Sequence, residues 1–443
     1  MLDNDFALKQ KSILQSCISD IDRHREKYVK NPGVDFTRNR KLSFENTIAF
    51  TLTMAGRSLN EAIYKFVSAN DLQSVSKQAL IMQRNKLNEK AFSDLFYEYN
   101  RRSKTSDTNK FKGHHVYAVD GTYLRTYRNP ESDSYCAKQD YNQYLITSVM
   151  DVFNNTFLDL EVTSKPKSHE ITSFRNILER TDANDAELGS IFLFDRLYFS
   201  FDLYETLNRK GYNSIFRVKD NMLYELRDKP MCEFDIDLTR EIRTTQTKED
   251  KELYKARKAF YIPGFSKFGK HKKQVYWHFE SRFKLTFRAL RICIGEGKYE
   301  TIITSLPRSL YSLEDIKELY RRRWQIETNF RYLKYDEGLL RLHCRKDDFI
   351  KQEIYAHFTM MNFSQRIMNS VVFEKQDDHK HEYQVNHSNG FFICKEFFRS
   401  VKNTDFNVME ALYKCKEPVR EGRADKRKLK KEKTAESLFY RLA

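Results

Sequence analysis

The stretch LYRRRWQIETNFRYLK, residues 319–334, decides how the rest of the chain is interpreted. A capping pair, Ser312 and Asp315, predicts that a helix begins just before it, and neither Gly nor Pro interrupts the pattern before Gly338. Successive residues of an α-helix are about 100° apart around its axis, so charged and phenolic side chains would fall within an arc of roughly 60° on this helix, beside an apolar stripe. The arc consists of Tyr320, Arg323, Glu327 and Lys334, and the stripe consists of Leu319, Ile326, Phe330 and Leu333. Alone, this pattern would fit a salt-bridged surface helix equally well.

The composition indicates a large folded protein with a polyanionic partner. The chain has 443 residues, of which 40% are hydrophobic, so we expect two or three domains or one large domain with insertions. Its 78 Lys and Arg against 62 Asp and Glu favour nucleic acid over a membrane, and we find no apolar run that is long enough to span a bilayer. The seven cysteines form no C-x-x-C pair, which predicts reduced thiols and neither a disulfide framework nor a zinc site.

Residues 1–110 are expected to form a helical DNA-binding region. Helical spacing and capping residues predict one helix at SLNEAIYKFV (58–67) and a second at SKQALIMQRNKL (76–87). Two short helices joined by a tight turn are typical of a helix-turn-helix, and here the second helix carries Lys77 and Arg84. Arg can reach purine edges in the major groove. An ordinary helical hairpin with a solvated face fits the local pattern equally well.

Residues 111–220 have the pattern of one mixed α/β sheet. Strands are predicted at VYAVDGTYL (116–124), YLITSVMDVF (144–153), TFLDLEVTS (156–164), SIFLFDRLYF (190–199) and YNSIFRVKD (212–220). Helices are predicted between the last three strands, so the order is that of a ribonuclease H-like mixed sheet. In that order the first and fourth strands are neighbours.

The remaining segments are expected to complete this domain and extend it. Residues 221–298 are interpreted as a β-rich insertion packed beside the catalytic sheet, and YETIITSLP (299–307) as a strand that returns to that sheet. Residues 299–370 would then complete the catalytic domain. We expect residues 371–443 to form a C-terminal helical region with a basic tail.

Three carboxylates are candidates for a metal site. Asp120 lies in the first predicted strand, Asp195 at the end of the fourth and Glu327 on the later helix. Mg²⁺ prefers a few carboxylates together with water and phosphate, and hydrolysis with two ions needs such ligands to converge. Each residue also has a simpler interpretation: a turn at Asp120, a cap at Asp195 and a solvent-exposed ion pair at Glu327.

The spacing Y-x-x-R-x-x-x-E, then six residues and K, resembles the signature of DDE transposases of bacterial insertion sequences, in the insertion-sequence-four-type group. VYAVDGTYLR (116–125) and FLFDRLYFS (192–200) are similar to the two blocks that carry the aspartates. The resemblance implies that Asp120, Asp195 and Glu327 bind two Mg²⁺ ions, with Mn²⁺ as a substitute. Leu197 stands where the second block commonly has glycine, which puts the local turn geometry in doubt.

The resemblance also implies DNA contacts. Tyr320, Arg323 and Lys334 would hold the end of the transposon, including phosphates near a flipped base, with Arg196 beside the second ligand. Tyr299 and Trp277 are both candidates for stacking on that base. His169 and Glu170 are expected to start a helix, and a place near the site is the less favoured interpretation.

The implied function is cut-and-paste transposition: metal-dependent nicking at the element ends, hairpin formation and resolution, then strand transfer into target DNA. The expected partners are terminal inverted repeats and target DNA, bound by a homodimer in a paired-end complex. The early residues lack a signal-peptide pattern, so we expect a bacterial cytoplasmic protein on the nucleoid and no membrane contact. The alternatives are a DNA-binding protein of this fold without transposition activity, a less specific nuclease and, least favoured, an RNA-binding protein.

Overall fold

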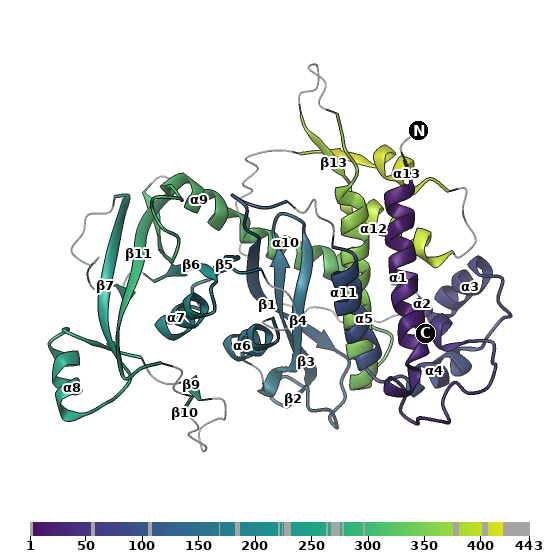
Figure 1. The fold of residues 1–443 in the computed structure, drawn as a ribbon. Helices are drawn as coiled ribbons and strands as arrows, with labels where there is room; N and C mark the ends of the chain where they lie inside the picture. The colour runs from purple at the N-terminus through teal and green to yellow at the C-terminus, as the bar shows by residue number, and fades with distance from the viewer. Residues whose placement is uncertain are drawn as a thin grey trace.

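The computed structural model describes residues 3–54, 58–104, 109–167, 169–181, 187–219, 222–223, 225, 232–262, 265–266, 275–276, 279–295, 297–374, 381–400 and 406–419. The molecule is elongated, with a helical body at one end, a mixed sheet in the middle and part of the predicted insertion at the other end (Figure 1). The basic tail predicted within residues 371–443 lies outside the described residues.

The central part of the sheet has the predicted topology. Its strands are β1 (Val116–Thr126), β2 (Tyr135–Cys136), β3 (Tyr141–Asp151), β4 (Thr156–Ser164), β5 (Ile191–Phe194) and β6 (Asn213–Val218). β3 pairs antiparallel with β1, β2 and β4, whereas β1 runs parallel to β5, and β5 runs parallel to β6. The order β4-β3-β1-β5-β6 confirms the ribonuclease H-like fold, and the first and fourth predicted strands are neighbours.

Helices cover both faces of this sheet. The helices on one face are α6 (Glu170–Thr181) and α7 (Phe201–Arg209), and those on the other are α9 (Leu313–Arg322), α10 (Trp324–Tyr335) and α11 (Asp347–Asn369). Side chains alternate along β1 with the strand period of two, so Tyr117 and Val119 join the core of α6 and α7. Val116 and Ala118 join the core on the side of α9–α11. The sheet is therefore buried on both sides in its centre.

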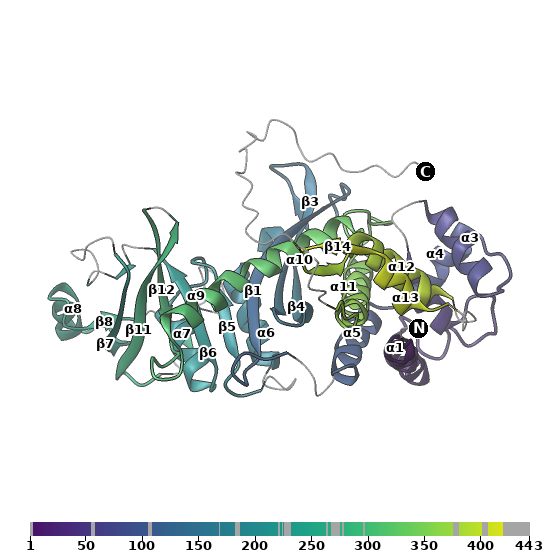
Figure 2. The same cartoon turned by 90° about the horizontal axis from the view of Figure 1, so that it is seen from above.

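The helix predicted from Ser312 begins where expected but is interrupted. The Ser312 and Asp315 capping box is complete, with each side chain bonded to the backbone of the other residue. α9 then ends at Arg322 and α10 begins at Trp324, with Arg323 between them at φ −52° and ψ −34°. Because these angles remain helical, the two segments follow one another across the sheet (Figure 2). The expectation of one continuous helix is corrected to two helices that meet at Arg323.

The predicted insertion extends the sheet. Its elements are β7 (Phe234–Arg243), α8 (Lys248–Lys255), β8 (Phe260–Tyr261), β9 (Phe265–Ser266), β10 (Val275–Tyr276) and β11 (Arg282–Gly295), and β12 (Lys298–Thr304) follows. β12 pairs with β6, β11 with β12 and β7 with β11, all antiparallel. The long insertion strands thus do not pack beside the sheet as expected. They continue it, because β12 gives the edge of β6 a partner and exposes a new edge of its own.

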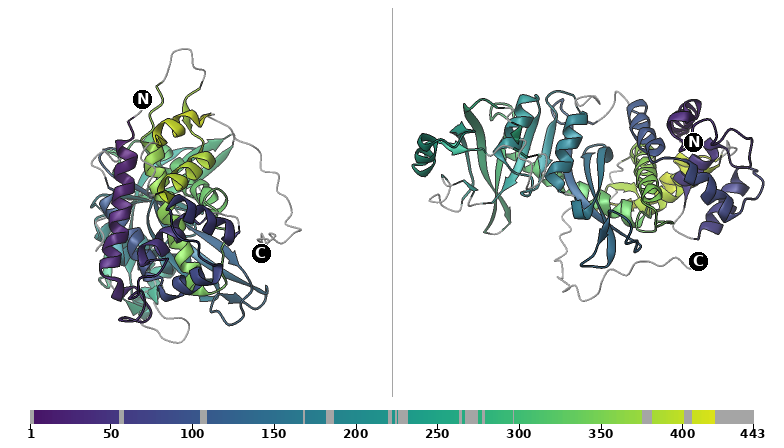
Figure 3. Two further views of the ribbon diagram at one scale, coloured as in Figure 1. Left: turned by 90° about the vertical axis from the view of Figure 1, so that its right-hand side faces the viewer. Right: turned by 90° about the horizontal axis from the view of Figure 1, so that it is seen from below.

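The N-terminal and C-terminal helices form one helical body. Its elements are α1 (Asp5–Arg23), α2 (Phe44–Thr53), α3 (Leu59–Ala69), α4 (Lys77–Lys86), α5 (Lys90–Arg102), β13 (Tyr383–Val385), α12 (His387–Arg399), α13 (Val408–Lys414) and β14 (Lys416–Pro418). Leu14 of α1, Phe92 of α5, Phe358 of α11 and Phe397 of α12 belong to the same buried core. Figure 3 accordingly shows the first and last helices at the same end of the molecule. The domain boundaries expected from the sequence stay predictions.

The two helices of the expected helix-turn-helix are both present. The hydroxyls of Ser58 and Ser76 cap α3 and α4 by accepting the backbone N–H of Glu61 and Ala79. Together with α2 they enclose a small core of their own, which includes Phe66 and Leu80. These helices were predictable because capping and helical spacing are local signals.

Arg84 lies elsewhere than expected. Arg84 is only 4% exposed. Its guanidinium donates hydrogen bonds to three acceptors in α11: Glu353 Oε1 at 2.9 Å, Gln352 Oε1 at 3.2 Å and the Phe349 carbonyl oxygen at 3.1 Å. Helical geometry explains the difference, because Arg84 lies on the same side of α4 as the core residue Leu80. Lys77 is exposed. The expectation that Arg84 contacts DNA is therefore corrected to a structural role.

Two further findings concern the described residues. All seven cysteines are free thiols. Of the helices in the described ranges, none is long and apolar enough to cross a membrane.

We predict that Arg84→Met destabilises the full chain by about 3–5 kcal/mol, because it leaves the fully buried Glu353 without its cation. Urea unfolding measures the change. Lys77→Met on the exposed side of α4 is the matched control and should change stability by less than about 0.5 kcal/mol. Coincident unfolding curves for the parent and Arg84→Met would contradict the structural role.

Candidate active site

The pairing of β1 with β5 brings two aspartates together. Val119 is the register partner of Phe194 in this parallel pair, and Asp120 and Asp195 directly follow them. Ala118 and Leu193, two residues earlier on each strand, both belong to the core beneath α9–α11. Because side chains alternate along a strand, we infer that both carboxylates project toward that same side. The sheet thus places two acids from distant sequence next to each other.

Arg323 lies between Glu327 and Asp120 and connects them by charge. Arg323 is 6% exposed, and its Nη2 lies 3.1 Å from Glu327 Oε1 while its Nη1 lies 3.9 Å from Asp120 Oδ2. Because Arg323 stands at the junction of α9 and α10, its guanidinium lies between the helix that carries Glu327 and Asp120 of β1. Burial lowers the pKa of Arg323, but the charges of Tyr320, Glu327, Asp120 and Asp195 outweigh it and raise this pKa. All three predicted carboxylates therefore act on one arginine.

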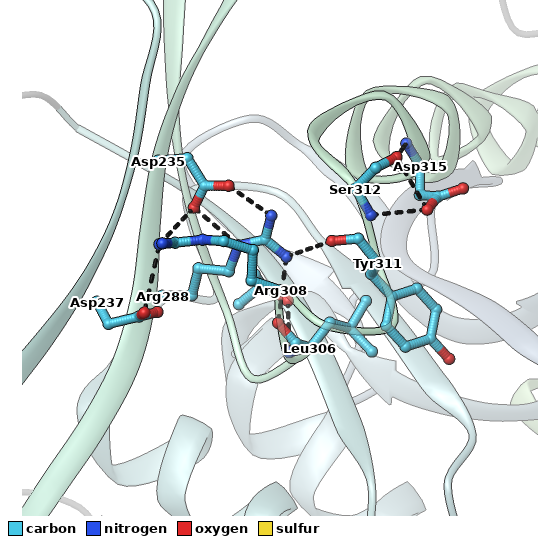
Figure 4. A network of polar contacts seen from close by, with 9 residues as sticks. Asp235, Asp237, Arg288, Leu306, Arg308, Tyr311, Ser312 and Asp315 are labelled. Atoms are coloured by element: carbon cyan, nitrogen blue, oxygen red, sulfur yellow. Dashed lines mark hydrogen bonds and ion pairs between the residues drawn. The ribbon is translucent and has the colours of Figure 1, made fainter.

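A buried ion network fixes the start of α9. Arg288 on β11 is 3% exposed and binds both carboxylate oxygens of Asp235 on β7, at 2.8 and 2.6 Å. Its Nη1 also donates to the Tyr311 carbonyl at 2.7 Å, immediately before the capping residue Ser312 (Figure 4). Arg308 adds contacts to Asp235 and Asp237 at 3.1 and 3.3 Å. The insertion strands thereby hold the loop from which α9, and then α10, projects over the sheet.

The same end of this loop is also tied to the segment before β1. The Nζ atom of Lys112 lies 2.6 Å from Asp315 Oδ2 and donates to the Leu310 carbonyl at 3.1 Å. Asp315 also caps α9 by accepting the Ser312 N–H at 2.7 Å. The position of Glu327 along the sheet therefore depends on polar contacts at the start of α9 as well as on its apolar stripe.

Burial makes Asp120 a carboxyl group that needs a cation. Burial raises the pKa of Asp120 from 3.8 to about 7, although the Gly121 N–H and the charge of Arg323 act in the opposite direction. The negative charges of Glu327 and Glu170 also contribute to this rise in the pKa. A divalent cation bound here would supply the compensation that Arg323 alone does not.

The donor chemistry fits a divalent cation, although the ligands are not gathered around one point. Asp195 Oδ1 is buried and has no hydrogen-bond partner in the described ranges, so it is an acceptor that a cation would satisfy. Carboxylate oxygens are also the ligands that Mg²⁺ prefers. In the part of the chain that the structure describes, however, no three His, Cys, Asp or Glu side chains stand in metal-binding geometry. Glu327 is instead held by Arg323.

A cavity of about 720 Å³ opens beside the junction of α9 and α10. It is lined by Arg217, Ile292, Cys293, Ile294, Glu300, Glu314, Lys317, Glu318, Tyr320, Arg321, Arg323 and Trp324. Among the described residues, the buried Tyr320 hydroxyl and the Nε and Nη1 atoms of Arg323 have no hydrogen-bond partner. Buried donors without partners indicate a place for an acceptor such as a phosphate oxygen.

The other predicted site residues are placed as follows. Arg196 is exposed directly after Asp195, and Lys334 is partly exposed further along α10. Tyr299 lies on β12 but does not line the cavity, whereas its neighbour Glu300 does. Trp277 lies outside the described residues. In the turn after Asp195, the Tyr198 N–H donates to the Asp195 carbonyl at 3.1 Å, and Leu197 is not in a left-handed conformation, so glycine is not required.

Two residues near the site were not favoured by sequence reasoning. Trp324 is 53% exposed and is an aromatic side chain of the cavity wall. It sits inside the quoted signature stretch but at a position that the spacing pattern leaves open. Glu170, the first residue of α6, packs against Gly121 beside Asp120. Its sequence signal, an acid at a helix start, is common and does not by itself indicate a site.

One family model matches the part of the chain that carries this site. A family model described as "Transposase DDE domain" matches residues 111–363, more than half of the chain. Among solved structures, the chain is similar to a cryo-EM structure of the piggyBac transposase synaptic complex with hairpin DNA, with 10% sequence identity and a TM-score of 0.43, covering 98% of this chain and 88% of that chain. None of the curated proteins matches. Because the family model covers more than half of its length, the chain belongs to the family of DDE transposases, enzymes that act on DNA in transposition.

Proposed function

We propose that this transposase moves a bacterial insertion sequence of the insertion-sequence-four type by a cut-and-paste reaction, with Asp120, Asp195 and Glu327 as its catalytic carboxylates. The observation that carries the proposal is the convergence of these acids: Asp120 and Asp195 directly follow a paired position of two adjacent parallel strands, and Glu327 shares Arg323 with Asp120. The spacing of Tyr320, Arg323, Glu327 and Lys334 supports assignment to this group.

The three carboxylates would hold two Mg²⁺ ions, for which Mn²⁺ would substitute. When bound, such ions activate water and stabilise the charge that develops on the phosphate. The protein contributes the position of the ligands. Asp120 and Asp195 are fixed by backbone pairing within a buried sheet, and Glu327 is carried by a helix whose start is fixed by ionic contacts. This rigidity fits a site whose ligands must hold a reacting phosphate in line.

Arg323 has a separate role in the proposal. In the metal-free protein its guanidinium offsets the charges of Glu327 and Asp120. Its Nε and Nη1 have no hydrogen-bond partner among the described residues, so donors remain for a DNA phosphate. As metal and DNA bind, Arg323 would exchange carboxylate oxygens for phosphate oxygens, and Glu327 would become free to act as a ligand.

The DNA end would lie along the cavity beside α9 and α10. Tyr320 and Arg323 would contact the backbone there, and Lys334 and Arg196 would add positive charge on either side. A base flipped out near the cleavage site would stack on an aromatic side chain, and among the described residues Trp324 is better exposed to this cavity than the sequence candidate Tyr299. Lys77, on the exposed side of α4, would contact the terminal inverted repeat.

The remaining steps follow from the sequence signature. A first nick frees a 3′-hydroxyl, which attacks the opposite strand to form a hairpin; the hairpin is opened, and the same hydroxyl attacks target DNA. Two copies of the chain would act in a paired-end complex on the bacterial nucleoid, in the cytoplasm. A protein of this fold that binds DNA without transposition, and a less specific nuclease, are the two alternatives that the next experiment separates.

We predict that Asp120→Ala and Glu327→Gln each lower excision from a donor plasmid by about a hundredfold or more, because each removes a ligand of the ions that stabilise charge in the transition state. The control is Glu249→Gln on α8, an exposed acid in the insertion, which should leave excision unchanged. In a gel-shift assay, all variants should still bind a DNA duplex that carries one terminal repeat. Equal excision by Glu327→Gln and the parent would refute the proposed enzyme, and equal affinity for repeat and random duplex would favour a nuclease.

We also predict a pH-dependent stability difference at Asp120. Its pKa is about 7 in the folded, metal-free protein against 3.8 ordinarily, so between these values the folded state binds more protons than the unfolded state. Stability therefore falls as the pH rises through this window. Metal-free Asp120→Asn should melt at least ~2 °C above the parent at about pH 8, with the difference closing toward about pH 4. Mn²⁺ should stabilise the parent only; a constant difference at all pH values would contradict this account.

A further inference from the structure

Glu170 approaches the catalytic centre from the opposite face of the sheet. It is the first residue of α6, which covers the face away from α9 and α10, and it lies where β1 carries Asp120 and Gly121. The three carboxylates of the proposed function come from β1, β5 and α10. An acid on α6 would therefore approach Asp120 and Asp195 from the face of the sheet opposite to α10.

Gly121 provides the space for this approach. A Cβ atom at this position would lie 2.8 Å from Glu170 Cδ and 3.0 Å from its Oε1, closer than real Cβ contacts allow. Only a residue without a side chain lets the carboxylate rest on this backbone. The N–H of the same glycine donates to Asp120 Oδ1 at 2.8 Å. The carboxylates of Glu170 and Asp120 thus both lie against Gly121.

Tyr198 links Glu170 to the second aspartate. This tyrosine is fully buried in the core on the α6 side, and its backbone N–H donates to the Asp195 carbonyl at 3.1 Å. Its ring packs edge-on against Phe174 of α6. The helix that begins with Glu170 therefore lies directly behind the turn that carries Asp195.

We propose that Glu170 is a fourth carboxylate of the catalytic centre and contributes an oxygen to a divalent cation held by Asp120 and Asp195. This inference rests on the proposed function and adds a ligand to it. The buried Asp195 Oδ1, which has no hydrogen-bond partner within the described ranges, is an independent sign that the centre lacks a cation. Arg323 offsets Glu327 and Asp120 from the α10 side, whereas Lys165 and His169 are the cations that act on Glu170.

Calorimetric titration of the full chain with Mn²⁺, without DNA, tests the ligand role independently of activity. Glu170→Gln keeps the size and hydrogen-bonding capacity of the side chain and should weaken Mn²⁺ binding about 10–100-fold. Glu179→Gln, an exposed acid on the same helix, is the matched control and should bind as the parent does. Asp120→Asn should abolish binding. Thermal unfolding without metal checks that each variant is folded.

Gly121→Ala provides a second variant that leaves every carboxylate in place. The added methyl should displace Glu170 and weaken Mn²⁺ binding in the parent, with little further effect in Glu170→Gln, because both changes remove the same contact. If Asp120→Asn loses Mn²⁺ binding while Glu170→Gln and Gly121→Ala bind as the parent does, Glu170 is not a ligand and the proposed function stands. If Asp120→Asn also binds as the parent does, the metal site itself is refuted.

Discussion

The parallel pairing of β1 with β5 is the constraint on which the site depends. It fixes Asp120 and Asp195 side by side in a sheet that is covered on both faces. Carboxylates that are crowded and partly withdrawn from water repel one another and favour protonation, as the raised pKa of Asp120 illustrates. The structure must therefore supply positive charge at this point. Arg323 supplies part of it in the metal-free protein, and a bound cation would supply the rest.

The helical arm α9–α10 connects this charge balance to the rest of the molecule. Its start is held by Arg288 and Lys112, which join it to the insertion strands and to the segment before β1. Its inner side packs on the sheet through the apolar stripe predicted from the sequence, including Leu319 and Phe330. The insertion therefore has a structural function, because it continues the sheet and anchors the helix that carries Glu327. Loss of the Arg288–Asp235 ion pair would therefore alter the position of Glu327, although neither residue lies in the active site.

Much of this arrangement could be predicted because its signals are local. The alternation in the segment of β1 and the apolar run in the segment of β5 indicated the strands, and Ser312 with Asp315 indicated the start of α9. Family resemblance then assigned the three acids. Other features depend on tertiary packing, which a single sequence does not display. The burial of Arg84 follows from the partner that α11 presents, and the proximity of Glu170 follows from the space left at Gly121. The interruption of the helix at Arg323 could not be predicted, because neither Gly nor Pro stands there.

The central claim is that Asp120 in β1 and Asp195 after β5 form a cation site that α10 completes. Diffraction from crystals of the chain with a DNA end and Mn²⁺, recorded for anomalous scattering, measures this directly. The account predicts Mn²⁺ within about 2.2 Å of carboxylate oxygens of Asp120 and Asp195, with Glu327 turned from Arg323 toward the ions. Anomalous density that is absent beside these two aspartates, with Glu327 still paired to Arg323 beside bound DNA, would contradict it.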